Sequence, residues 1–190
     1  MFDPYYNCQP TMVLGKPVCC LGTMGSILPV TLRFLQSTTM LPVTDLERLL
    51  EHRMGKNLSY LAHNYNAEDI FVEENKILQS ILGQKPLSLV LLRYNTLYYR
   101  VNRDTLHQME GIYLEESPEQ IWKKIEEQRI QEHPLDRHID RYLLQEYKSF
   151  QAEHTVWKRY IPAHWIRIVV GAEAPLSVAE KILQVVQQGM

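Results

Sequence analysis

The sequence has few cysteines and none at metal-binding spacing. The three are Cys8, Cys19 and Cys20, and without a C-x-x-C pair they indicate neither a zinc site nor a disulfide framework. The N-terminal residues 1–8 lack the basic start and apolar centre of a secretory leader. No apolar run approaches the roughly 20 residues of a membrane span. We therefore expect free thiols and a cytoplasmic protein.

An excess of charge of one sign is also missing. The chain has 20 Lys and Arg against 22 Asp and Glu, which gives a formal net charge of −2. Without a basic field, neither nucleic acid nor an anionic membrane is expected as a partner. At 190 residues and 45% hydrophobic content, the chain is long enough for one globular domain with a core or an internal cavity.

Signatures of cofactor and metal sites are absent from the sequence. There is no G-x-S-x-G, no phosphate-binding glycine loop and no dinucleotide fingerprint, and the pair Gly22 and Gly25 does not start such a pattern. The histidines His133, His138 and His154 fall in different predicted segments, without H-E-x-x-H spacing. We expect no metal and no cofactor.

The hydrophobic pattern predicts an α+β fold. Residues 1–26 predict an irregular lead-in, and a single domain follows over 27–190. Short helices are predicted from Ser26 and from Thr44, where Thr44 and Glu47 form a capping box and Gly55 can end the helix. Helices also follow Ser117 and Leu135. The apolar segments between the two helix pairs predict strands of a largely antiparallel sheet, over 58–63, 70–72, 76–82 and 87–101.

The C-terminal stretch has two interpretations. Two strands joined near Gly171 would place Glu180 on an apolar face, where its pKa would be raised and would suit proton transfer. Alternatively, Ser177 and Glu180 form a capping box at the start of one amphipathic terminal helix. In that case Glu180 only closes a helix end.

Three separated patterns resemble the chorismate pyruvate-lyase family, which makes 4-hydroxybenzoate and pyruvate from chorismate. They are Leu32–Thr39 with Val43–Glu47, then Pro134–Ile139, and finally Trp157–Tyr160 with Gly171 and Pro175–Glu180. The resemblance implies a mostly antiparallel sheet with helices packed on one face and an enclosed ligand cavity. It also implies a strand at Glu180.

The same resemblance implies a function and a site. Pyruvate would be eliminated from chorismate or a related enolpyruvyl precursor, with Glu180 as the catalytic acid/base and with Val43 and Leu135 lining the product. The ligand would be a small anionic aromatic or cyclohexadienyl acid. Amides at a helix start can hold such a carboxylate, and Val43 and Leu135 both lie at predicted helix starts.

One departure weakens the catalytic interpretation. The family carries an arginine in a central strand that pairs with the substrate carboxylate, and Ser80 stands in its place here. A buried carboxylate without a cation loses a charge-assisted interaction. Arg93, or less favourably Arg100, on a neighbouring predicted strand is the candidate replacement. The alternatives are a non-catalytic module of the same fold that binds an aromatic acid, and an interaction or assembly protein.

Overall fold

The computed structural model describes residues 16–23, 25–83, 88–130 and 147–188. Helices and strands alternate along this part of the chain. In chain order the elements are β1 (Val18–Gly22), α1 (Leu28–Thr39), β2 (Val43–Asp45), α2 (Leu46–Met54), α3 (Leu58–Asn64), α4 (Ala67–Leu82), β3 (Leu89–Leu91), the 3-10 helix η1 (Tyr94–Tyr98), α5 (Arg100–Leu106), β4 (Glu110–Glu115), α6 (Pro118–Ile130), α8 (Tyr147–Lys158), β5 (Ile166–Val169) and α9 (Pro175–Gln187).

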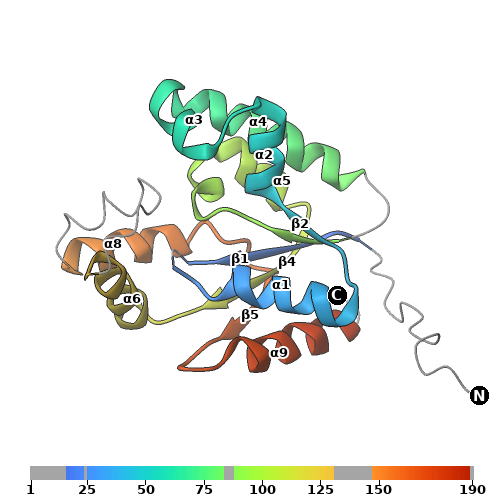
Figure 1. The fold of residues 1–190 in the computed structure, drawn as a ribbon, viewed down its shortest axis with the longest axis vertical. Coiled ribbons are helices and arrows are strands. Elements are labelled where there is room, and N and C mark those ends of the chain that lie inside the picture. The colour runs from blue at the N-terminus through green and yellow to red at the C-terminus, as the bar shows by residue number, and fades with distance from the viewer. Residues whose placement is uncertain (1–15, 24, 84–87, 131–146, 189–190) are drawn as a thin grey trace, which may run out of the picture.

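The described strands form one five-stranded parallel sheet in the order β2-β3-β1-β4-β5 (Figure 1). The central strand β1 pairs with β3 through Cys19 and Val90 and with β4 through Cys19 and Gly111. Parallel neighbours require long crossover connections, and here these connections are helical. The result is an open, doubly wound α/β domain.

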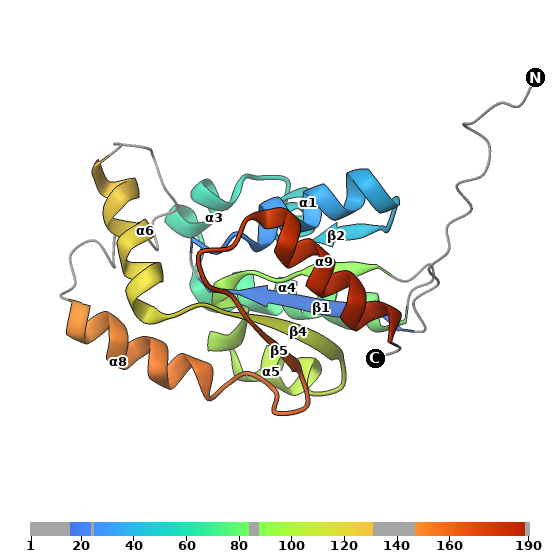
Figure 2. The ribbon, with the colours of Figure 1, turned by 90° about the horizontal axis from the view of Figure 1, so that it is seen from below.

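Alternating side chains of β1 face two separate hydrophobic layers. Val18 and Cys20 pack against α1 and α9, whereas Cys19 and Leu21 pack against the layer that includes α2, α4 and α8. Figure 2 shows α1 and α9 together on one side of the sheet. A strand covered on both faces contains a continuous apolar run, because neither face meets water.

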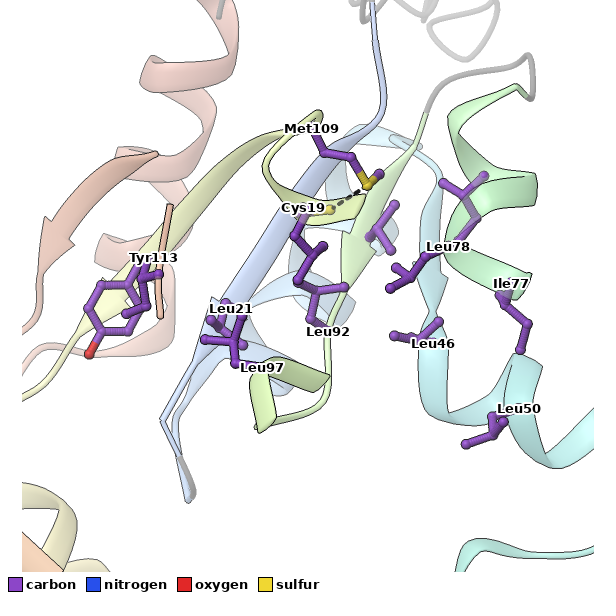
Figure 3. Packing of buried hydrophobic residues seen from close by; sticks show 14 of the residues in the cluster. Cys19, Leu21, Leu46, Leu50, Ile77, Leu78, Leu92, Leu97, Met109 and Tyr113 are labelled. Atoms are coloured by element: carbon purple, nitrogen blue, oxygen red, sulfur yellow. Dashed lines mark hydrogen bonds between the residues drawn. The ribbon is translucent and has the colours of Figure 1, made fainter. Parts of the chain in front are cut away.

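Both described cysteines are free thiols in this core. Cys19 Sγ lies 3.6 Å from Met109 Sδ, close to Leu92 and Leu97 (Figure 3). Burial raises the pKa of the Cys20 thiol to about 12 and also raises that of Cys19. Because the thiolate is the reactive form, these are structural side chains and not nucleophiles.

The predicted antiparallel α+β fold is wrong. The sheet is parallel and has helices on both faces. Residues 58–63, 70–72 and 76–82, predicted as strands, lie in α3 and α4. Buried positions along α4 recur with helical spacing, since Ile70, Ile77 and Ile81 lie on one face. The prediction treated the short apolar segments of α4 separately, so their common helical period was missed.

The N-terminal prediction also needs correction. Val18–Gly22, within the predicted irregular lead-in, is the central strand of the sheet. The first helix was predicted correctly, because α1 buries Leu28, Leu32 and Leu35. The second helix ends at Gly55 as predicted, but its N-cap is Asp45 and not the predicted Thr44.

The helices in the described part of the chain are too short or too polar to cross a lipid bilayer.

Gly111 of β4 provides a test of the packing between the strand and Trp165. A Cβ at Gly111 would overlap the Trp165 indole, which is fixed by a 2.9 Å hydrogen bond from its Nε1 to the Met109 carbonyl. We expect Gly111→Ala to lower the free energy of unfolding by about 1–3 kcal/mol, the usual cost of overpacking. Urea denaturation measures this loss.

Gly171→Ala is the matched control, because a Cβ at Gly171 would meet nothing within 4 Å. The same substitution there should leave the free energy of unfolding nearly unchanged or slightly raised, since alanine restricts the unfolded chain. Equal effects of the two substitutions would contradict the described packing of Trp165.

Candidate functional site

The candidate site lies at the carboxyl ends of β1, β2 and β3. The crossover after β1 leads to α1 on one face of the sheet, while η1 and α5 after β3 lie on the other face. In open α/β sheets such a change of side leaves a crevice at the strand ends. A pocket of about 340 Å³ occupies this position, lined by the loop after β1, the first turns of α1, the start of α2 and the segment after β3.

Asp45 holds a negative charge at one side of this pocket. It ends β2 and is the N-cap of α2, where its Oδ1 accepts hydrogen bonds from the amides of Glu47 at 3.0 Å and Arg48 at 3.4 Å. The N-terminal end of a helix favours such a charge. A carboxylate has about four acceptor sites, so Asp45 can also accept from a ligand hydroxyl.

Arg93 lines the same pocket and is fixed by a buried carboxylate. Its side chain is only 8% exposed, and its Nη1 lies 3.4 Å from Oε1 of Glu74 on α4. Glu74 also accepts from Thr96 Oγ1 at 2.9 Å and from Asn102 Nδ2 at 3.0 Å. Burial raises the pKa of Glu74, although the charge of Arg93 opposes the shift. The positive charge of Arg93 is therefore largely compensated from behind the pocket.

The loop between β1 and α1 has the position of a phosphate-binding loop, which joins a strand to a helix with the signature G-x-x-x-x-G-K-[S/T]. With Gly22 as the first glycine, Ile27 stands at the second, Leu28 at the lysine and Pro29 at the hydroxyl residue. Leu28 is buried in the core. The residue types that hold phosphate and Mg²⁺ are therefore replaced, in agreement with the missing sequence signature.

Two backbone donors of this loop are engaged within the loop itself. The Leu28 amide donates to Ser26 Oγ at 3.2 Å, and the Ser26 amide donates to the Thr23 carbonyl at 3.0 Å. Pro29 has no amide proton to donate. A phosphate would have to replace these contacts, whereas an ordinary phosphate-binding loop offers free amides.

Several polar side-chain atoms are buried without a hydrogen-bond partner. Within the described ranges these are Thr23 Oγ1, Asn102 Oδ1, Tyr113 Oη, Glu116 Oε1 and His154 Nε2. Of these side chains, that of Thr23 lines the pocket. Unpaired buried polar atoms are costly, so the Thr23 hydroxyl is suited to a ligand.

The acid/base expected at the C-terminus is not positioned for catalysis. Glu180 is exposed within α9 and does not lie in a strand, and it lines neither of the two pockets at this edge of the sheet. The predicted capping box is also wrong in detail, because the helix begins at Pro175 after the N-cap Ala174. Ser177 Oγ donates instead to Glu173 Oε2 at 3.1 Å.

The other predicted site residues are dispersed. Ser80 lies on α4 and donates its hydroxyl proton to the Ile77 carbonyl at 2.7 Å. Val43 lies in β2 and lines a second pocket beside the first, and Leu135 falls outside the described residues. Arg93 lines the first pocket, and its role as an anion-binding cation stays a prediction. The predictions missed Asp45, which ends β2 and is the N-cap of α2.

Comparisons with known proteins identify the fold. Neither a family model nor a curated protein matches the chain. The shikimate kinase of Acinetobacter baumannii, solved in complex with shikimate, has a TM-score of 0.68 at 16% identity, over 94% of this chain and 95% of that one. The shikimate kinase of Bacteroides thetaiotaomicron gives 0.69 at 14%, over 90% and 98%. A gluconokinase from Sinorhizobium meliloti gives 0.53 at 12%, over 91% and 92%.

These likenesses establish the fold of small-molecule kinases and overturn the resemblance to chorismate pyruvate-lyase. Three predictions depended on that resemblance and lose their support. They are the elimination of pyruvate, the enclosed cavity of that fold and the catalytic role of Glu180. The three patterns that carried the resemblance were short. Their residues lie in α1, β2, α2, α8 and α9 of a parallel α/β protein, in the segments that follow α8 and precede α9, or outside the described residues.

Removal of Arg93 should reveal its structural role. Arg93→Met leaves the Glu74 carboxylate buried without a cation, and we expect a loss of about 3–5 kcal/mol in the free energy of unfolding. Arg100→Met is the control, because the Arg100 side chain is 85% exposed and lies 4.0 Å from Asp104. Its loss should cost at most about 1 kcal/mol. Equal, small losses in denaturant unfolding would contradict the buried pair.

His154 predicts a pH dependence of stability. Burial between Phe150 and Trp157 lowers the pKa of His154 to about 4, whereas the unfolded histidine titrates near 6.5. The unfolded chain therefore binds a proton first, and stability should fall as the pH decreases from about 6.5 toward 4.

We expect His154→Gln to lose less stability between pH 7 and pH 5 than the unmodified protein does, measured by urea unfolding at each pH. His107→Gln, at an exposed position, controls for the loss of one histidine. An unchanged pH slope in His154→Gln would show that this histidine does not remain neutral in the folded protein.

Proposed function

We propose that this protein binds a small hydroxylated carboxylic acid in the pocket at the ends of β1, β2 and β3, and that it does not transfer phosphate from a nucleotide. The observation that carries the proposal is a contrast between two neighbouring parts of one site. The pocket keeps charged and hydroxyl groups for a ligand. The loop that would hold a nucleotide phosphate has Leu28 and Pro29 in place of the binding residues, and the amides of Ser26 and Leu28 donate within the loop.

The chemistry of the pocket supports a ligand with several hydroxyls and one carboxylate. Asp45 and Glu47 offer acceptors for hydroxyl protons, and Arg33 offers a cation for a carboxylate. The buried Thr23 hydroxyl and the Asn95 amide add neutral polar contacts. A purely apolar ring would leave these polar groups without hydrogen-bond partners, and each unpaired group would weaken binding.

The named neighbours support the same ligand class. One is a shikimate kinase in complex with shikimate, a hydroxylated ring acid, and another is a gluconokinase. Sequence identities of 16% and 12% leave room for different ligands on one fold. We therefore propose the class of ligand and not a particular compound, and we place the protein in the cytoplasm.

The loss of phosphoryl transfer follows from what this reaction requires. Catalysis of the transfer consists largely of positioning and of neutralising phosphate charge, with a lysine and a metal-holding hydroxyl at the loop. At Leu28 and Pro29 the chain has an apolar side chain and a ring without an amide proton. The internal contact from the Leu28 amide to Ser26 Oγ further satisfies a donor that phosphate would otherwise use.

Isothermal titration with shikimate and with D-gluconate tests the binding half of the proposal. We expect saturable binding of at least one acid to the unmodified protein. Asp45→Asn should weaken it about tenfold or more, because the change retains the helix cap but removes the charge-assisted contact to a ligand hydroxyl. Arg100→Gln on α5 is the control and should leave binding unchanged. No binding of either acid would overturn the proposal.

Phosphorus NMR tests the catalytic half. Incubation with ATP, Mg²⁺ and the bound acid should yield neither ADP nor a phosphorylated acid, while a shikimate kinase assayed alongside produces both from shikimate. Turnover by the unmodified protein that Asp45→Asn abolishes would show that this site performs phosphoryl transfer and would overturn the proposed loss.

A further inference from the structure

A second pocket adjoins the proposed ligand site. It has a volume of about 320 Å³ and lies between α1 and the start of α2, over the end of β2. Pro29, Arg33, Asp45 and Leu91 line both pockets. Because the two hollows share these walls, one ligand can extend from the first into the second, with Arg33 and Asp45 at the junction.

The two pockets differ in charge. In the first, Arg33 and Arg93 are balanced by Asp45 and Glu47, and Glu74 lies behind Arg93. In the second, two cations, Arg33 and Arg48, face the single carboxylate of Asp45. Part of the charge of Asp45 is already engaged by the first amides of α2. The second pocket therefore has an excess of positive charge that the first lacks.

Both cations of the second pocket are available to a ligand. Arg33 is exposed on α1 and makes no ion pair with any of the described residues. Arg48 has a side chain that is 79% exposed, and its Nε lies 3.8 Å from Asp45 Oδ2. Such a surface contact is weak. A guanidinium group can bind a carboxylate or phosphate through two parallel hydrogen bonds.

Neutral polar groups complete the second pocket. Gln36 lies close to one turn beyond Arg33 on α1, so that both side chains can reach the same ligand. Thr44 of β2 is held by a 2.8 Å hydrogen bond between its hydroxyl and that of Ser88. These groups have the donor capacity to solvate an anion without adding charge.

We infer that the natural ligand carries a second anionic group, a phosphate or a second carboxylate, held between Arg33 and Arg48. Its hydroxylated part then lies beside Asp45 in the first pocket. The inference rests on the proposed function and narrows it to doubly anionic hydroxy acids. Arg48 becomes a specificity residue, because it lines the second pocket and not the first.

Isothermal titration with a matched series of acids tests this inference. D-gluconate has one carboxylate, D-glucarate has two, and 6-phospho-D-gluconate has a carboxylate and a phosphate on the same carbon chain. We expect at least one of the doubly anionic acids to bind about tenfold or more tightly than D-gluconate at low salt. The advantage should shrink as the salt concentration rises, since exposed charges are screened.

Two variants separate the second pocket from the first. Arg48→Gln should abolish the advantage of the second anion and leave the affinity for D-gluconate unchanged. Arg33→Gln should weaken all three acids, because Arg33 lines both pockets. Arg100→Gln, an exposed arginine on α5, should change neither affinity nor selectivity.

The outcomes distinguish this inference from the proposal on which it rests. Equal binding of all three acids, or an advantage that survives Arg48→Gln, would overturn the second anionic site while the hydroxy-acid pocket remains. No binding of any of the three acids or of shikimate would overturn both. Loss of the advantage in Arg48→Gln supports the inference. If 6-phospho-D-gluconate binds more tightly than D-glucarate, the second anionic group of the natural ligand is a phosphate; if D-glucarate binds more tightly, it is a carboxylate.

Discussion

Burial of β1 on both of its faces is the constraint on which the rest of the structure depends. A five-residue strand with helices above and below needs apolar side chains in both directions, and Val18–Leu21 supplies them. Its parallel partners β3 and β4 require crossover connections, and α1 after β1 lies on one face of the sheet while η1 and α5 after β3 lie on the other. The switch between these faces creates the pocket. The site is therefore a consequence of the sheet topology, and its specificity comes from the residues at the strand ends.

Those end residues differ between the two parts of the site. Asp45, Arg93 and Thr23 present charged and hydroxyl groups to the pocket, and the buried Glu74 network fixes Arg93. In the loop after β1, by contrast, Ser26 Oγ accepts a hydrogen bond from the Leu28 amide. The two parts of the site can differ in this way because they lie on different loops of one rigid sheet.

The sequence predicted local elements better than their assembly. Leu28, Leu32 and Leu35 recur with helical spacing, and a proline stands in the first turn. The helix α1 was therefore predicted correctly. The runs Val18–Leu21 and Leu89–Leu91 are too short to separate a buried strand from other apolar segments, so the parallel sheet was missed. The terminal segment contained both a strand, β5, and a helix, α9, and local spacing alone could not assign Glu180.

The site was predictable in one respect only. Arg93 was recognised as a candidate cation. Its partner Glu74, however, lies between residues 70–72 and 76–82, which were predicted as two strands and belong to the single helix α4. Contacts between α4 and the segment after β3 arise from the crossover, which no local pattern encodes. The absence of a phosphate-binding signature at Gly22 is a property of the sequence alone. Its meaning became clear only when the structure placed that segment between a central strand and a helix.

The most direct test of the central claim is a nuclear magnetic resonance titration that follows the backbone amides of Thr23, Gly25, Ser26, Leu28 and Asn95. The account predicts that a bound hydroxy acid shifts the signals of Thr23 and Asn95 in a saturable manner. Added Mg²⁺ and ADP should leave the signals of Gly25, Ser26 and Leu28 in place. Saturable movement of those three signals with the nucleotide would contradict the account, because it would mean that the loop still receives phosphate.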